Sequence, residues 1–338
     1  MAASLPDRPL AELSLDDLLD RYRELDLSAG DDEAADDARA EEADRIAAEV
    51  LRRDPADRGM WFDRGLVAKW RRDWPAASAH NARSLELVPE DERREEPAAW
   101  NLGIAATARR DWATARRAWA AYGIPVGGSG EEPVDDDLGA GAVRLNPPVR
   151  YVGQRDLEID GRVHEPEVVW GLRIDPARIR IASVPTPGSG HRFGDVVLHD
   201  GEPQGTRRSD GVEFPVFDEI ELWERSPVPT SSVVVRGSEE AVDELQHALD
   251  RAGLAVEDWT TGVGVLCRAC SDGVVDDHDH HPHDHHPHDH DPHDHDPEAD
   301  GGRRLGVAED PEVALRVVHA WLDAAPGRES DDVVVELE

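Results

Sequence analysis

Residues 61–77 read WFDRGLVAKWRRDWPAA, and part of this stretch recurs further along the chain. Its small and aromatic positions return 38 residues later, where Gly65, Asp73, Trp74 and Ala77 are followed by Gly103, Asp111, Trp112 and Ala115. Proline supplies a second period, because Pro55 and Pro89 lie 34 residues apart and each ends a predicted helix. A period of this length is typical of helix-turn-helix repeats, whose units must stack to bury their apolar faces.

Helices are predicted on both sides of this stretch, over residues 10–124. Apolar residues follow helical spacing after Ser14, a candidate N-cap, and again in a second helix that ends before Pro55. An acidic loop over residues 30–37 is expected to separate these two helices. Residues 1–124 are therefore predicted to form a helical repeat domain.

This region, about the first third of the chain, resembles the tetratricopeptide repeat family. The matching consensus positions are Trp61, Gly65, Ala77 and Pro89 in one copy and Leu102, Gly103, Ala115 and Trp119 in the next. The resemblance implies a protein or peptide partner that binds in a concave groove lined by the first helix of each pair. Carried over by position, the partner-binding residues are Phe62, Leu66, Lys69, Trp70, Trp100 and Ile104. The family's carboxylate-clamp pattern is not reproduced, since Leu66 and Ile104 stand where asparagine is expected.

The aromatic residues of the repeats also have a second interpretation. Six of the ten tryptophans lie between Trp61 and Trp119, and large aromatic side chains at helical spacing commonly pack in a core. We expect core positions for Trp74 and Trp112. For Trp70 both interpretations, core residue and groove residue, stay open.

The middle of the chain changes from helical to strand patterns. Glycine-rich and acidic composition predicts a flexible acidic linker over residues 125–142. Short β-branched and apolar runs then predict a small all-β barrel or sandwich over residues 143–229. The expected strands cover residues 168–174, 178–184, 195–199 and 214–223. Asp200-Gly201 and Asp210-Gly211 are predicted hairpin turns.

Several polar residues of this middle domain are of the types that build nucleophilic sites. Ser189 and His191 lie in one predicted turn, and His199 and Asp200 are adjacent in the sequence. Ordinary turn chemistry explains the same residues, and the sequence does not fix their geometry. No catalytic residue is assigned.

Residues 230–338 show two βαβ patterns in series. The expected strands cover residues 232–236, 254–260, 303–307 and 333–337, and the expected helices cover residues 239–252 and 311–324. This order predicts a ferredoxin-like domain, a single antiparallel sheet with both helices on one face. A Cys/His-rich loop, residues 267–302, falls between the second and third strands.

That loop carries metal-ligand chemistry. Cys267 and Cys270 are the only cysteines in the chain, and ten of the sixteen histidines lie between Cys267 and Pro297. Proline recurs every five residues there, which excludes a helix and predicts an extended, disordered insertion. A zinc site is predicted at the two thiolates and nearby imidazoles, with Ni or Cu as further candidates for the histidines. The candidate ligands are Cys267, Cys270, His278, His280, His281, His283 and His285. A neutral low-complexity insertion and a redox-active cysteine pair are the alternatives.

Composition limits the possible partners and compartment. The chain holds 74 Asp and Glu against 37 Lys and Arg, a net charge of −37 that repels nucleic acid and anionic membranes. Two cysteines, no signal peptide and no membrane-spanning run predict a cytoplasmic protein. We therefore expect a multidomain α+β protein that acts as an interaction scaffold or adaptor with a zinc-binding Cys/His-rich loop. A zinc-dependent hydrolase with a site in the β domain and a metal storage or delivery protein are the alternatives.

Overall fold

The computed structural model describes residues 8–30, 32–209, 211–260 and 302–338. The chain divides into two compact units, each of which is described by itself. The helical unit comprises Met1–Asp137, Pro148–Asp156 and Ile174–Ala177, and the β-rich unit comprises Leu138–Pro147, Leu157–Arg173 and Arg178–Glu338. The helical unit thus contains two short pieces of chain that come from within the sequence range expected to form the β domain.

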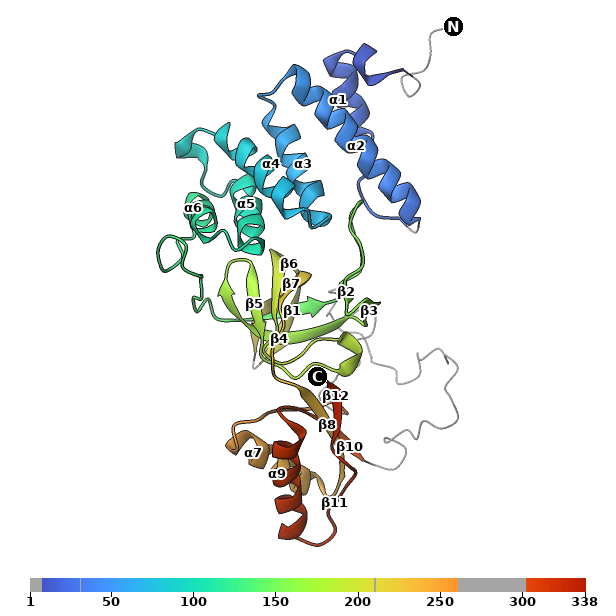
Figure 1. Cartoon of the computed structure of the whole chain (residues 1–338), viewed down its shortest axis with the longest axis vertical. Helices are drawn as coiled ribbons and strands as arrows, with labels where there is room; N and C mark the ends of the chain where they lie inside the picture. The colour runs from blue at the N-terminus through green and yellow to red at the C-terminus, as the bar shows by residue number, and fades with distance from the viewer. Residues whose placement is uncertain (1–7, 31, 210, 261–301) are drawn as a thin grey trace. The chain divides into compact units, whose positions relative to one another are not determined.

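The helical unit is a stack of packed helices, coloured blue to cyan in Figure 1. Its elements are η2 (Leu10–Glu12), α1 (Leu15–Arg23), α2 (Glu33–Arg53), α3 (Arg58–Trp70), α4 (Trp74–Glu86), η3 (Glu90–Glu92), α5 (Pro97–Ala108) and α6 (Trp112–Tyr122). Each helix from α1 to α6 packs on the next, and α3 also packs on α5. The predicted helical N-terminal region is confirmed.

The recurring Asp-Trp pair has a structural explanation. Asp73 and Asp111 are N-caps, and their carboxylates accept hydrogen bonds from the amides of Ala76 and Thr114. The tryptophan that follows each cap, Trp74 or Trp112, begins the next helix and is buried, as predicted. Each repeated dipeptide therefore starts the second helix of a pair and fixes it in the core.

The recurring glycine marks the contact between the two helices of a pair. A Cβ atom on Gly65 would lie 2.4 Å from Nδ2 of Asn81, and one on Gly103 would lie 2.6 Å from the ring of Trp119. Any side chain at either position would collide with the facing helix. Glycine at this position thus allows α3 to approach α4 and α5 to approach α6.

The acidic loop expected at residues 30–37 is shorter than predicted. Helix α2 begins at Glu33, because the Asp32 side chain accepts hydrogen bonds from the amides of Ala34 and Ala35. Acidic residues in the first turn are also favourable at the positive end of the helix dipole. Most of the acidic residues that were predicted to form a loop therefore form the N-terminal turn of α2. The other predicted cap, Ser14, is confirmed by a capping box with Asp17.

The β-rich unit begins with a closed five-stranded barrel in the order β1-β4-β5-β6-β7. These strands are β1 (Ala140–Leu145), β4 (Glu167–Asp175), β5 (Arg178–Ile181), β6 (Val196–Ser209) and β7 (Val212–Glu224). The pairs β1–β4, β5–β6 and β6–β7 are antiparallel, and β1 runs parallel to β7 where the barrel closes. A small hairpin, β2 (Glu158–Ile159) and β3 (Arg162–Val163), and the short helix η4 (Pro187–Ser189) lie in its connections. The predicted small β domain is thus a barrel.

Two details of the middle region differ from the sequence expectation. Strand β1 starts at Ala140, inside the range expected to be linker. Asp200-Gly201 is not a hairpin turn, because β6 continues through both residues with an irregular register to β7. Gly201 has φ +77°, which lets the strand bulge there without ending. The hairpin instead joins Ser209 to Val212, on either side of the second predicted turn.

The C-terminal part of this unit has the predicted ferredoxin-like topology. Its elements are β8 (Thr230–Arg236), α7 (Glu239–Arg251), β9 (Ala255–Asp258), β10 (Arg303–Ala308), α9 (Pro311–Ala324), β11 (Glu329–Ser330) and β12 (Val334–Leu337). The sheet has the order β11-β8-β10-β9, with β12 also paired to β8, and every pairing is antiparallel. Trp321 of α9 donates a hydrogen bond to the carbonyl of Ala241 in α7, so the helices pack together (Figure 1).

The helices that the structure describes include none that is both long and apolar enough to cross a bilayer.

Candidate functional site

The aromatic ring of Trp70, the last residue of α3, stacks on a ring from a distant part of the chain. Its partner is Tyr151, with ring centroids 4.4 Å apart and an interplanar angle of 16°. Nζ of Lys69 lies 4.3 Å from the Trp70 ring centroid and donates a hydrogen bond of 3.0 Å to Oδ1 of Asn101 in α5. Trp70 therefore links α3 to a segment outside the helical repeats.

Tyr151 belongs to residues 148–156, which we call the crossing segment. Its backbone pairs with the connection between α1 and α2. The Ala29 amide donates to the carbonyl of Arg150 at 2.9 Å, and the Val152 amide donates to the carbonyl of Leu27 at 3.1 Å. Together these two bonds form an antiparallel bridge between Ser28 and Tyr151.

Near its C-terminal end, the crossing segment forms ion pairs with α2. The Arg155 guanidinium donates hydrogen bonds to the carboxylate of Asp37, and its Nε lies 2.9 Å from Oε1 of Glu33. Asp37 and Glu33 both lie in the first turns of α2. The hydrogen bond from Arg155 lowers the pKa of Asp37. The side chains of Arg155, Asp37 and Glu33 are 41%, 39% and 73% exposed, so each of these pairs contributes roughly 0 to 1 kcal/mol.

A turn joins these two ends. The Gln154 amide donates to the Tyr151 carbonyl at 3.0 Å, and Gly153 has φ +78°. This combination is typical of a type II turn, which favours glycine at its third position. A Cβ on Gly153 would also lie 3.0 Å from Nε of Arg71 and 3.5 Å from Cβ of Ala40. The positive φ favours glycine here, and a larger residue would also have to displace the Arg71 side chain.

The six residues predicted to line a groove are in different environments. Trp70 contacts the crossing segment, and Leu66 is half-buried. Ile104 is fully buried and Lys69 is 3% exposed, so neither side chain is accessible to a ligand in this arrangement.

The other two predicted groove residues contribute to helix packing. Phe62 packs against a core that includes Leu85 and Ala98. The Trp100 ring lies 5.1 Å from the ring of Trp119 and 4.9 Å from that of Tyr122. Of the six predicted residues, Trp70 is the one whose ring stacks on the crossing segment.

Tyr151, Gly153 and Arg155 were not predicted as site residues. The sequence analysis placed them in the β domain because strand patterns surround them. Pro147 and Pro148 do indicate an extended start to the segment, since proline disfavours helix in the residue before it. Nothing in the local pattern indicates that the segment packs on α2 and α3.

A second group of polar residues is buried in the β-rich unit. The side chains of His191, Asp195 and Glu219 are all 0% exposed. Nε2 of His191 lies 3.1 Å from Oε2 of Glu219, and Nδ1 lies 3.5 Å from Oδ2 of Asp195. Burial alone would lower the pKa of His191, but the two carboxylates raise it to about 9. This group is a buried imidazolium between two carboxylates.

The structure does not bring the predicted serine and histidines together as a nucleophile and its base. The Ser189 hydroxyl donates to the Thr186 carbonyl and accepts from the backbone amide of His191, so it does not face an imidazole nitrogen. His199 is fully buried and stacks on Phe217 at 4.6 Å. Burial, with Arg173 nearby, lowers the pKa of His199 to about 3, which keeps this imidazole neutral.

The predicted metal ligands lie outside the described residues. This applies to all seven: Cys267, Cys270, His278, His280, His281, His283 and His285. Within the part of the chain that the structure describes, no group of three or more His, Cys, Asp or Glu side chains could hold a metal ion.

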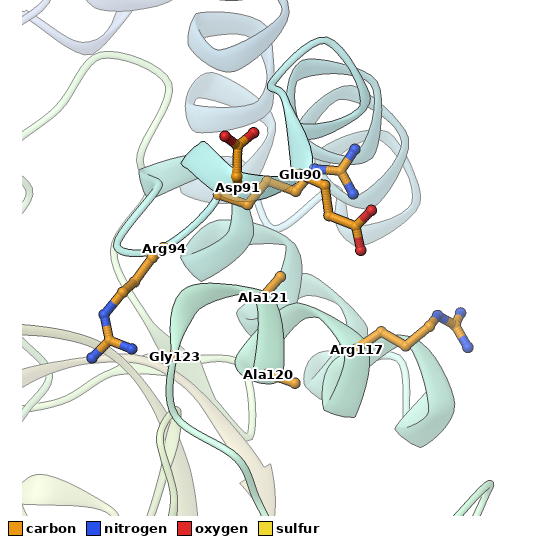
Figure 2. Close-up of a pocket in the computed structure, with 8 residues that line it drawn as sticks. Glu90, Asp91, Arg94, Arg117, Ala120, Ala121 and Gly123 are labelled. Carbon is orange, nitrogen blue, oxygen red and sulfur yellow. The ribbon is translucent and has the colours of Figure 1, made fainter.

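An open pocket of about 500 Å³ lies near the end of the helical stack (Figure 2). It is lined by Glu90, Asp91, Arg93, Arg94, Arg117, Ala120, Ala121 and Gly123. Figure 2 shows the side chains of Arg94 and Arg117 on opposite sides of the pocket. Because these charges do not converge on one point, the pocket is not a strong candidate for a ligand site.

Comparisons with protein-family models, with curated proteins and with solved structures found no match for this chain. Its function must therefore be inferred from its own residues and contacts.

Proposed function

We propose that this protein is an interaction scaffold whose tetratricopeptide-like helical repeats bind a segment of a protein or peptide partner. The stack of Tyr151 on Trp70 is the observation that carries the proposal. It is a contact between the repeat helices and a non-helical piece of chain, which is the kind of contact that a bound peptide makes. Aromatic anchors of this type dominate many binding surfaces.

The repeat pattern supports the same function. Gly65 and Gly103 allow close packing within each helix pair, and Asp73 and Asp111 start the second helix of each pair. A stack built from such units is a preformed framework around Trp70, so binding there does not require the helices themselves to fold.

A capture experiment tests the scaffold function. The tagged full chain should retain specific partners from a lysate of its own cells, and Trp70→Ala should lose them by removing the aromatic anchor. Quantitative mass spectrometry of the captured proteins is the measurement, and circular dichroism checks that the variant is folded. Trp61→Ala, at the other end of α3, is the control and should retain the partners. Unchanged capture by folded Trp70→Ala would contradict the proposal.

We also propose that the scaffold carries zinc on its Cys/His-rich loop. Apo-protein titrated with zinc against a chelator should show one tight equivalent, because thiolates bind zinc strongly at neutral pH. Two of His278, His280 and His281 are proposed to complete the site. Cys267→Ala with Cys270→Ala should abolish the tight equivalent.

The later histidine copies should bind further zinc ions only weakly. Their imidazoles must be neutral to bind, so this weak class should be lost first on acidification, around the ordinary imidazole pKa of roughly 6.5. His293→Ala with His295→Ala is the matched control and should keep the tight equivalent. A tight equivalent that survives the double cysteine substitution would place the metal elsewhere.

A further inference from the structure

We propose that the crossing segment is the internal ligand of a peptide site on the helical unit. We further propose that the external ligand of this site is a partner loop with an aromatic residue followed four positions later by arginine. This inference rests on the proposed function, because it names the chemistry that the helical repeats recognise. Four features of the crossing segment support the inference: its aromatic ring, its turn, its arginine and its backbone hydrogen bonds.

The ring contact selects an aromatic residue. Tyr151 lies nearly parallel to the indole of Trp70, and Lys69 lies against that same indole. Nε1 of Trp70 is buried and has no hydrogen-bond partner among the described residues, so the ligand is recognised through the ring face. An aromatic side chain covers such a face with few rotatable bonds to order.

The turn is held by contacts within the crossing segment itself. Besides the bond from Gln154 to Tyr151, Oε1 of Gln154 accepts hydrogen bonds from the amides of Arg150 and Tyr151, at 2.9 and 3.3 Å. A separate peptide of the same sequence contains every one of these groups. It can therefore form the same turn, which lowers the entropy lost when it binds.

The arginine contact selects a basic residue. Arg155 reaches Asp37 and Glu33 on α2, and the chain as a whole has a net charge of −37. One guanidinium nitrogen of Arg155 hydrogen-bonds both carboxylate oxygens of Asp37. Both the local carboxylates and the overall field therefore favour a cationic ligand at this position.

The backbone contact is small enough to be exchanged. The bridge between Ser28 and Tyr151 lies outside the β-strands, and among the described residues it contains two backbone hydrogen bonds. Main-chain hydrogen bonds carry no information on side chains, so another chain with the same turn can form them equally well. Side-chain selection then comes from the aromatic and arginine positions.

The test uses a fluorescent peptide of residues 147–157, PPVRYVGQRDL, and fluorescence anisotropy with the full chain. The internal segment competes at high effective concentration, so the wild-type chain should bind the peptide weakly. Tyr151→Ala with Arg155→Ala vacates the site and should bind the peptide about tenfold or more tightly, because apparent affinity rises with the fraction of open site. Adding Trp70→Ala to this double variant should abolish binding.

Two controls keep the result interpretable. Arg155→Glu alone repels Asp37 and Glu33 from an exposed position, so it should also increase peptide binding even if the double variant does not fold. A peptide with alanine at the positions of Tyr151 and Arg155 should not bind. Circular dichroism and a melting curve establish that each variant is folded.

The outcomes separate this inference from the proposed function. If the folded variants bind the peptide no better than the wild-type chain, or bind it independently of Trp70, the inference is overturned and the crossing segment is a fixed structural contact. If partner capture still depends on Trp70 in that case, the scaffold function stands with a different ligand chemistry. Tight, Trp70-dependent peptide binding with no cellular partner would support the site and contradict the scaffold function.

Discussion

Replacing Glu219 by alanine should lower the free energy of unfolding of the β-rich unit by about 3 kcal/mol in neutral or mildly acidic solution. The substitution removes a carboxylate 3.1 Å from the buried imidazolium of His191. It also leaves the backbone amide of Asn146 without the acceptor that it has at 3.0 Å. Chemical denaturation followed by tryptophan fluorescence is the measurement.

The size of this effect should depend on pH. The pKa of His191 is raised from an ordinary value of 6.5 to about 9 in the folded protein. For a base with a raised pKa, the stabilisation is fully present below the unfolded pKa and is lost as the pH rises through the folded pKa. The Glu219→Ala penalty should therefore be largest below about pH 6.5 and smaller above about pH 9. A penalty that is equal on both sides of this window would contradict a charged His191.

Glu213→Ala is the matched control in the same strand. Glu213 pairs with Arg208, and both side chains are largely exposed. An exposed ion pair contributes roughly 0 to 1 kcal/mol, so this variant should unfold almost as the wild-type protein does. A large penalty here would point to general damage to β7 and not to the buried pair.

Replacing Gly103 by valine should lower the free energy of unfolding of the helical unit by roughly 3 kcal/mol or more. A Cβ at this position would lie 2.6 Å from three atoms of the Trp119 ring, and that ring is fully buried. The indole cannot move away without opening the contact between α5 and α6. Thermal unfolding followed by far-ultraviolet circular dichroism is the measurement.

Gly59→Ala is a control in the same helical stack that should change the free energy of unfolding in the opposite direction. Gly59 is exposed in the first turn of α3, and the closest atom to a new Cβ would be Oδ1 of Asp57 at 3.4 Å. Alanine there should stabilise the unit by about 0.5 to 1 kcal/mol, because it restricts the unfolded chain. If both variants behaved alike, the close approach at Gly103 would not be the cause of its effect.

The elements with strong periodic patterns were predictable from the sequence. The helices around Trp74 and Trp112 and the two βαβ units around Val233 and Val318 bury one apolar face each, and such a face leaves a regular spacing. Their boundaries follow from local chemistry, such as the caps Asp73 and Asp111. Asp200-Gly201 was wrongly predicted as a turn because a bulged strand uses the same residue types.

The candidate site was much less predictable. Trp70 was recognised from its position in the repeat, but its ring partner Tyr151 is 81 residues away and leaves no periodic signal. Lys69 was expected on an accessible groove because its position matches a groove position of the family that the repeats resemble. It is buried because Asn101, on another helix, accepts its hydrogen bond. Contacts between distant residues depend on tertiary packing, which a local pattern does not encode.

The pairing of β9 with β10 has an evolutionary consequence. Asp258 pairs with Leu305, and the Arg304 amide donates to Oγ1 of Thr260, so the chain leaves and re-enters this sheet at neighbouring positions. Doubling the length of a loop between two such fixed ends costs only about 0.6 kcal/mol in closure entropy. We therefore expect changes in chain length between Thr260 and Arg303 to cost the folded domain little free energy. Insertion or deletion of the five-residue units in that part of the sequence should then be tolerated without loss of the sheet.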